Sequence, residues 1–178
     1  NISSIFIFPL RLKNAKVFLS TAILAAVFSV TAISQATADG MTWTSRTSAS
    51  DNDWYGITYG NGLFVAVSPI AAPNNQVMTS TNGIDWTSRS SASDNAWYSV
   101  TYGDGLFVAV SATGSGNRVM TSPDGTTWTS RTSAADNSWR SVTYGNGLFV
   151  AVSTTGTGKR VMTSPDGITW TSRSSAAD

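Results

Sequence analysis

The 178-residue sequence contains no histidine, no cysteine and no glutamate, so all ten of its acidic residues are aspartate. Without cysteine the chain has no disulfide framework and no thiolate metal site. Without histidine it lacks the most common general base and the most common transition-metal ligand. We therefore expect neither a metal nor another cofactor.

Positive charge is also scarce in most of the chain. Beyond residue 38, seven arginines and one lysine face ten aspartates, although the whole chain has a formal net charge of +1. Proteins that bind nucleic acids usually carry a basic surface. We therefore expect no nucleic-acid partner.

The first 38 residues have the pattern of a secretory signal peptide. Arg11, Lys13 and Lys16 precede an uncharged apolar run over residues 17–33, and Ala36-Thr37-Ala38 follows it. A basic region, an apolar region and an A-x-A site predict cleavage before Asp39 and export to the periplasm, the cell surface or the medium. The alternative is an uncleaved membrane anchor, because the run is almost long enough to span a bilayer. Any contact with a membrane is expected through this segment alone.

After residue 38 the chain repeats with a period of about 42 residues. Residues 87–128 and 129–170 are identical at 33 of 42 positions, and residues 44–86 form a related copy with one extra residue between Ser68 and Val77. That insertion indicates a surface loop. Residues 171–178 begin another copy. Two sets of tryptophans mark the repeat, namely Trp43, Trp86, Trp128 and Trp170, and Trp54, Trp97 and Trp139.

Each repeat predicts four strands. In residues 87–131 they cover 97–102, 106–111, 118–122 and 127–131, joined by a three-residue hairpin link at 103–105, a glycine-rich loop and a Pro-Asp-Gly turn. The second strand is apolar on both faces, as expected for a strand packed between two other sheets. We predict an all-β fold, a β-propeller of four-stranded blades with about three and a third repeats in residues 39–178.

The turn near the end of each repeat resembles the Asp-box, or BNR, repeat of sialidase-like β-propellers, with one residue fewer between Asp and Gly than is usual. The matching segments are Ser122-Pro-Asp-Gly-Thr-Thr-Trp128 and Ser164-Pro-Asp-Gly-Ile-Thr-Trp170, the variant Ser80-Thr-Asn-Gly-Ile-Asp-Trp86, and a tail at residues 39–43. We expect a structural role, because Ser and Asp side chains can bond main-chain groups of the turn while Trp covers it. The residues concerned are Ser80, Asn82, Gly83, Trp86, Ser122, Asp124, Gly125, Trp128, Ser164, Asp166, Gly167 and Trp170.

The resemblance also raises the possibility of an enzyme, for which the sequence offers no catalytic residue. Sialidases resemble one another in an arginine cluster and a tyrosine nucleophile with a glutamate partner, and this chain has no glutamate. Its Arg46, Arg89, Arg131 and Arg173 recur at one place in every repeat. That recurrence predicts strand ends, paired with Asp51, Asp94 or Asp136, and not a converging cluster.

Ligand-binding candidates come from the positions at which the repeats differ. The triplets at 53–55, 96–98 and 138–140 vary, as do the loops at 112–117 and 154–159, and such positions can carry specificity on a repeat scaffold. Core packing of the tryptophans and neutral drift of the loops explain the same pattern. The candidates are Trp54, Tyr55, Trp97, Tyr98, Trp139 and Arg140, with a glycan or a cell-surface polymer as the expected partner.

A propeller generally needs four to eight blades, so three and a third repeats leave open blade faces. We expect a fragment of a longer propeller, or self-association through the open faces. The predicted function is an exported, non-catalytic module for binding or structural scaffolding. The alternative is a fragment of a sialidase-like glycoside hydrolase whose catalytic residues lie in further blades.

Overall fold

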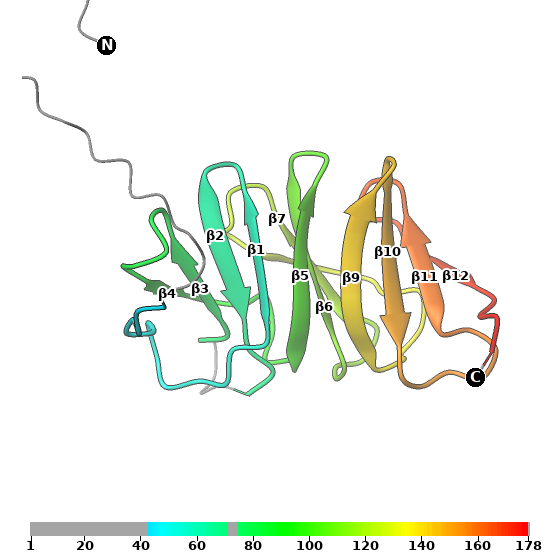
Figure 1. The fold of residues 1–178 in the computed structure, drawn as a ribbon. Coiled ribbons are helices and arrows are strands. Elements are labelled where there is room, and N and C mark those ends of the chain that lie inside the picture. The colour runs from blue at the N-terminus through cyan, green and yellow to red at the C-terminus, as the bar shows by residue number, and fades with distance from the viewer. Residues whose placement is uncertain (1–42, 71–74, 178) are drawn as a thin grey trace, which may run out of the picture. The chain divides into compact units, whose positions relative to one another are not determined.

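The computed structural model describes residues 43–70 and 75–177, which form three four-stranded antiparallel sheets placed side by side (Figure 1). The predicted signal peptide at 1–38 and part of the insertion at 71–74 lie outside the described residues. Among the residues described, no helix is long and apolar enough to cross a membrane.

Each sheet is called a blade below; its first three strands lie in one repeat, and its fourth strand is the start of the next repeat. Blade 1 contains β1 (Gly56–Gly60), β2 (Leu63–Val67), β3 (Val77–Ser80) and β4 (Thr87–Arg89). Blade 2 contains β5 (Trp97–Gly103), β6 (Leu106–Ser111), β7 (Val119–Ser122) and β8 (Thr129–Arg131). Blade 3 contains β9 (Trp139–Gly145), β10 (Leu148–Ser153), β11 (Val161–Ser164) and β12 (Thr171–Arg173).

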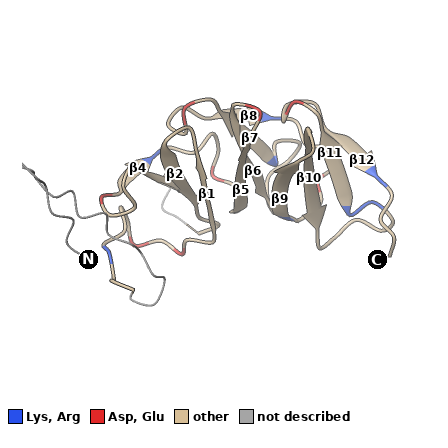
Figure 2. Ribbon diagram, turned by 45° about the horizontal axis from the view of Figure 1, so that its top comes forward, with Lys and Arg blue, Asp and Glu red and all other residues tan. Residues whose placement is uncertain are grey.

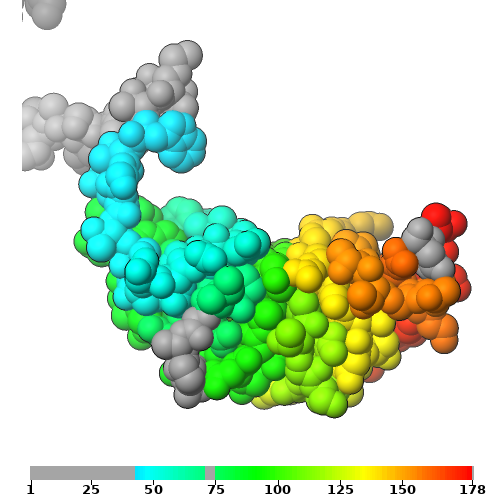
Figure 3. Space-filling model, turned by 90° about the horizontal axis from the view of Figure 1, so that it is seen from below, coloured from blue at the N-terminus to red at the C-terminus, as the bar shows by residue number. Residues whose placement is uncertain are grey.

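Every blade is an up-and-down meander in which each strand pairs with the next strand along the chain. The first strands of the blades are neighbours, with β1 beside β5 and β5 beside β9. In the space-filling view from the end at which these strands begin, the blades follow one another in chain order (Figure 3). The predicted all-β architecture of four-stranded blades is confirmed.

Tight turns join the first and second strands of each blade. The register pairs Gly103 with Leu106, so the link contains only Asp104 and Gly105, whose φ angles are 48° and 75°. Two positive φ values are typical of the type I′ turn, whose twist matches that of paired strands. The predicted three-residue link was therefore one residue too long, because Gly103 is the last residue of β5.

The core lies between the blades, in two clusters of nearly the same composition. Between blades 1 and 2, three valines of blade 1 meet six side chains of blade 2, which are Trp97, Val100, Phe107, Ala109, Met120 and Trp128. Between blades 2 and 3, three valines of blade 2 meet Trp139, Val142, Phe149, Ala151, Met162 and Trp170. The middle strand β6 is buried on both faces because it contributes to both clusters.

A glycine at the end of each first strand lets the next blade approach closely. A Cβ on Gly60 would lie 2.1 Å from the ring of Tyr102, and a Cβ on Gly103 would lie 2.0 Å from the ring of Tyr144. Any side chain at Gly60 or Gly103 would collide with the tyrosine of the following blade. Gly145 has no neighbouring atom within 4 Å of such a Cβ, because it ends the first strand of the last described blade.

Three of the four repeated arginines, Arg89, Arg131 and Arg173, lie on the fourth strands, where blue segments mark β4, β8 and β12 in Figure 2, whereas Arg46 lies on no strand. The Arg131 side chain donates its Nε to Thr121 Oγ1 on the adjacent strand at 2.9 Å. Asp136 instead approaches Arg118, with 3.6 Å between carboxylate and guanidinium. The expected pairing of Arg131 with Asp136 was therefore wrong. In antiparallel strands Thr121 and Arg131 lie on one face, since Thr121 pairs with Thr129, two residues from Arg131.

Candidate functional site

The turn between the third and fourth strands of blade 2 is closed by its own side chains. Ser122 Oγ donates to Asp124 Oδ1 at 2.9 Å and accepts from the amide of Gly125 at 2.8 Å. Asp124 Oδ1 also accepts from the amides of Thr126 and Thr127, both at 2.8 Å. The Ser122 hydroxyl and the Asp124 carboxylate are therefore engaged in hydrogen bonds within the turn itself.

The equivalent turns of the other blades repeat this arrangement. In blade 3, Asp166 Oδ1 accepts from the amides of Ile168 and Thr169 at 2.8 and 2.7 Å. In blade 1, Asn82 Oδ1 accepts from the amides of Ile84 and Asp85, both at 2.9 Å. An amide oxygen therefore replaces a carboxylate oxygen without loss of the turn geometry.

Main-chain hydrogen bonds lower the pKa of both turn carboxylates. The amides of Thr127 and then Thr126 hold the pKa of Asp124 well below its usual value. The amides of Thr169 and then Ile168 lower the pKa of Asp166 to about 2. A lowered pKa makes a carboxyl group a poor proton donor near neutral pH, so neither residue is suited to general acid catalysis.

The tryptophan that ends each turn has a different environment in blade 1. Trp128 and Trp170 are each 9% exposed and donate Nε1 to the carbonyls of Gly125 and Gly167, both at 3.1 Å. Trp86 is only half-buried, since no described blade packs on its side of blade 1. Trp43 is 90% exposed and lies outside the sheets.

The second set of tryptophans is buried at the entrance to the first strands. Trp97 and Trp139 are fully buried, and their Nε1 atoms donate to the carbonyls of Ser93 and Ala135, both at 3.0 Å. Their indole faces pack between blades, so we withdraw both as ligand contacts. Trp54 is half-buried, and its Nε1 approaches the carbonyl of Ser50 at 3.4 Å.

The residue after each buried tryptophan occupies a β-bulge. In blade 2, Trp97 pairs with Ser111 and Ser99 with Val110, which leaves Tyr98 as the additional residue. The register of blade 3 shifts at the same place and leaves Arg140 as the additional residue. A bulge redirects a side chain out of the alternating pattern of its strand. Because of these bulges, the side chains of Tyr98 and Arg140 do not share the buried environment of the tryptophans that precede them.

The structure brings the variable residues of the three blades together in one row. The rings of Tyr55 and Tyr98 meet edge to face with centroids 5.4 Å apart. The Arg140 guanidinium lies over the ring of Tyr98, with Cζ 3.9 Å from its centroid. We call these three residues the Tyr–Tyr–Arg row. Tyr55 is 62% exposed and Arg140 is exposed, whereas Tyr98 is half-buried between them.

Variable loops border the row. The amide of Ala96 donates to Thr113 Oγ1, and the amide of Ser138 donates to Thr155 Oγ1, both at 2.8 Å. These bonds attach the loops at 112–117 and 154–159 to the residues just before Trp97 and Trp139. The positions that vary most between blades 2 and 3 therefore gather at one end of the first strands.

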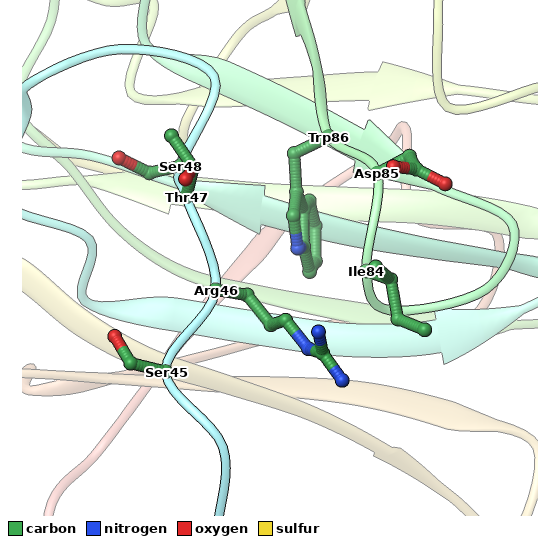
Figure 4. A pocket seen from close by; sticks show the side chains of 7 residues that line it. All are labelled: Ser45, Arg46, Thr47, Ser48, Ile84, Asp85 and Trp86. Carbon is green, nitrogen blue, oxygen red and sulfur yellow. The ribbon is translucent and has the colours of Figure 1, made fainter.

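A separate hollow of about 410 Å³ lies on the open side of blade 1 (Figure 4). Residues 45–48 form one wall and residues 84–86 form the other. Arg46 and Trp86 point into the space between the two segments. Across the described part of the chain, no three His, Cys, Asp or Glu side chains are grouped so that they could hold a metal ion.

Comparison with solved structures supports the fold. YCF48 bound to D1 peptide matches with a TM-score of 0.54 and 18% identity over 76% of this chain and 44% of that one. The computationally designed Ika4 protein matches with a TM-score of 0.51 and 8% identity over 76% of this chain and 82% of that one. This chain thus spans less than half the length of YCF48.

The Bombyx mori GH32 beta-fructofuranosidase BmSUC1 is less similar, with a TM-score of 0.41 and 15% identity. The match covers 68% of this chain and 34% of that one. This similarity is too low to bear on function. No model of a known protein family matches the sequence, and no curated protein matches it. The fold is that of a β-propeller, built here from three four-stranded blades.

Proposed function

We propose that this chain is an exported, non-catalytic β-propeller module that binds glycans or other surface polymers through the Tyr–Tyr–Arg row. The observation that carries the proposal is the contrast at the two bulges. Trp97 and Trp139 are the same residue and are fully buried, while the residues that follow them, Tyr98 and Arg140, differ and contact each other outside the core clusters. Differences confined to grouped surface positions are what a repeat scaffold uses to set specificity.

The chemistry of the row suits a sugar chain with acidic groups. An exposed tyrosine offers an apolar face to the C–H groups of a sugar ring and a hydroxyl for hydrogen bonding. A guanidinium stacked on an aromatic ring keeps its N–H donors at its edge, where they can bind a carboxylate in bidentate fashion. Tyr98 holds both groups, through the edge-to-face contact with Tyr55 and the cation–π contact with Arg140.

Two features of the sequence support export and the ligand class. Residues 1–38 have the pattern of a signal peptide, which would deliver the chain to the side of the membrane where surface polymers lie. The serine–aspartate turns resemble the Asp-box of sialidase-like propellers. Their bonds to main-chain amides supply a structural reason for that motif.

The proposal is tested by screening the full chain on a glycan array and then measuring affinity by calorimetry. Probes are an oligogalacturonate, which carries carboxylates, and a neutral cello-oligosaccharide. The Tyr55→Ala variant should lose at least about tenfold in affinity, equivalent to about 1.4 kcal/mol. Tyr59→Ala is the matched control, since Tyr59 is similarly exposed, 58% against 62%, but lies at the other end of β1.

The Arg140→Tyr variant tests the role of the charge. It installs the residue found in blades 1 and 2, so the blade should fold normally. We expect it to lose affinity for the oligogalacturonate and to keep whatever affinity the chain has for the neutral probe. If no array glycan binds, or if Tyr55→Ala and Tyr59→Ala bind equally well, the row is not the binding site.

A further inference from the structure

The chain contains two internal interfaces between blades, and each joins two different apolar faces. The outer blades 1 and 3 each expose one of these two faces. Each internal cluster joins a valine face of one blade to a Trp-Val-Phe-Ala-Met-Trp face of the next. Blade 3 ends the described chain with an unmatched valine face, made of Val150, Val152 and Val161. Blade 1 begins it with the unmatched opposite face, made of Trp54, Ile57, Phe64, Ala66, Met78 and Trp86.

Exposure shows that parts of these faces lack a neighbour among the described residues, although Ala66 and Met78 are only 2% and 7% exposed. Val65, Val67 and Val77 of blade 1 are fully buried beneath blade 2, whereas the equivalent Val152 of blade 3 is 45% exposed. On the opposite face, Val100 is 5% exposed, whereas the equivalent Ile57 is 60% exposed. The same side chains are therefore buried wherever a neighbouring blade is present.

We infer that a second copy of this chain docks its blade 1 onto blade 3 of the first. The occupant is a second copy because its blade 1 carries the residues by which blades 2 and 3 bind their predecessors. The contact is heterologous, joining two different surfaces, so repeated docking gives a ring or an open array. The described residues of two copies contain six blades, within the range of four to eight found in propellers.

The internal interfaces specify the contacts. Tyr59 of the second copy should lie over Gly145 as Tyr102 lies over Gly60, and Gly145 has room for it. Gly83 should approach Leu148 and Val150, because a Cβ on its equivalent Gly125 would lie 2.8 Å from Leu63 and 2.9 Å from Val65.

A polar contact should also be repeated. The amide of Val142 donates to Ser99 Oγ across the interface of blades 2 and 3, at 3.1 Å. Ser141 occupies the position of Ser99 in blade 3 and is exposed. The amide of Ile57 in the second copy is the equivalent donor.

Docking displaces one short segment. The hollow in Figure 4 occupies the place where the valine face would pack, and residues 45–48 cover it incompletely. Residues 43–48 are exposed and form no strand, so their movement breaks no sheet pairing. The hollow is therefore the blade interface of this chain without its partner blade.

The test uses light scattering on the full chain and on two variants, each damaged on one face. Gly145→Val adds a Cβ at a position with no neighbouring atom within 4 Å in the single chain, but it should collide with Tyr59 of a second copy. Ile57→Asp places a charge on the opposite face at a position that is exposed in the single chain. Ser130→Val, on the exposed outer strand of blade 2, is the control.

The wild-type chain and the control should associate with a Kd in the micromolar range or tighter. Each face variant alone should remain a single chain with an unchanged far-UV spectrum. An equimolar mixture of the two variants should form dimers and nothing larger, because only one intact pair of faces remains.

Two results would overturn the inference. One is a wild-type chain that stays monomeric at high micromolar concentration. The other is a mixture of the variants that stays monomeric although both are folded. Association of the variants to the wild-type extent would show that other surfaces mediate it, which also overturns the inference. Glycan binding by the monomeric Gly145→Val variant is measured separately, so failure of docking and failure of the binding proposal are distinguishable.

Discussion

Replacement of Trp128 by alanine should open a cavity between the first two blades. The indole is 9% exposed and belongs to the same buried cluster as Val65, Val67 and Phe107. Its Nε1 also satisfies the carbonyl of Gly125 at 3.1 Å. Truncation of a buried tryptophan to alanine destabilises proteins by about 3–5 kcal/mol. We expect the free energy of unfolding to fall by this amount.

The loss is large compared with the stability of a typical domain, about 5–15 kcal/mol. Urea unfolding followed by circular dichroism gives the measurement. With a slope of about 2 kcal/mol per M, a loss of about 4 kcal/mol moves the midpoint by about 2 M. The variant and the wild type are compared at the same low protein concentration, so that association between chains contributes equally little.

Trp86→Ala is the matched control because Trp86 ends the equivalent turn but is only half-buried. Its truncation removes less apolar surface from a packed environment, so we expect a loss of about 1–2 kcal/mol. Equal losses for the two variants would show that packing between blades adds nothing to this position. A midpoint that barely moves in Trp128→Ala would refute the assignment of Trp128 to the core.

Three further results are expected. Gly103→Ala should destabilise the chain by about 1–3 kcal/mol in urea unfolding, as overpacking does, because its Cβ would collide with the Tyr144 ring; unchanged stability would contradict the close approach of blades 2 and 3. Because the pKa values of Asp124 and Asp166 are lowered in the folded state, these carboxylates stabilise the fold above about pH 4, and this stabilisation is lost as the pH falls toward 2. The free energy of unfolding of the double Asp→Asn variant should therefore depend less on pH than that of the wild type. An unaltered pH dependence would contradict this explanation. Intact-mass analysis of exported material should give a chain that begins near Asp39, whereas retention of residues 17–33 would favour the membrane anchor.

Much of the fold could be predicted from the sequence because the repeat is nearly exact. The tryptophan spacing sets the length of a blade, and Gly-containing turns separate the strands within it. The apolar pattern of residues 106–111 predicts a strand covered on both faces, and β6 is buried on both. These features are local, so no knowledge of distant contacts was needed.

The candidate site could be predicted only in part, because bulges break the alternation on which strand patterns depend. The sequence groups Trp97 with Tyr98 as one candidate pair, yet Trp97 is fully buried and Tyr98 reaches the row. The available signal was the difference between blades 2 and 3: the tryptophan is the same at 97 and 139 and is buried, whereas the residue after it changes from Tyr98 to Arg140.

Pairing between strands was the other missing information. Whether Gly103 belongs to a turn or to a strand depends on the register with Leu106. The partner of Arg131 depends on the register of β7 and β8, which pairs Val119 with Arg131 and Thr121 with Thr129, so that Thr121 is the diagonal neighbour of Arg131 on the same face. Neither register can be read from the sequence of one strand.

The binding proposal is tested most directly by nuclear magnetic resonance of the arginine side chains during titration with the oligogalacturonate. The Arg140→Tyr variant identifies the Nε–H signal of Arg140 by its loss. We expect this signal to shift in a saturable way, while that of Arg131, whose Nε is bonded to Thr121, stays in place. Saturable binding with an unmoved Arg140 signal, or with shifts at Arg131 instead, would contradict binding at the Tyr–Tyr–Arg row.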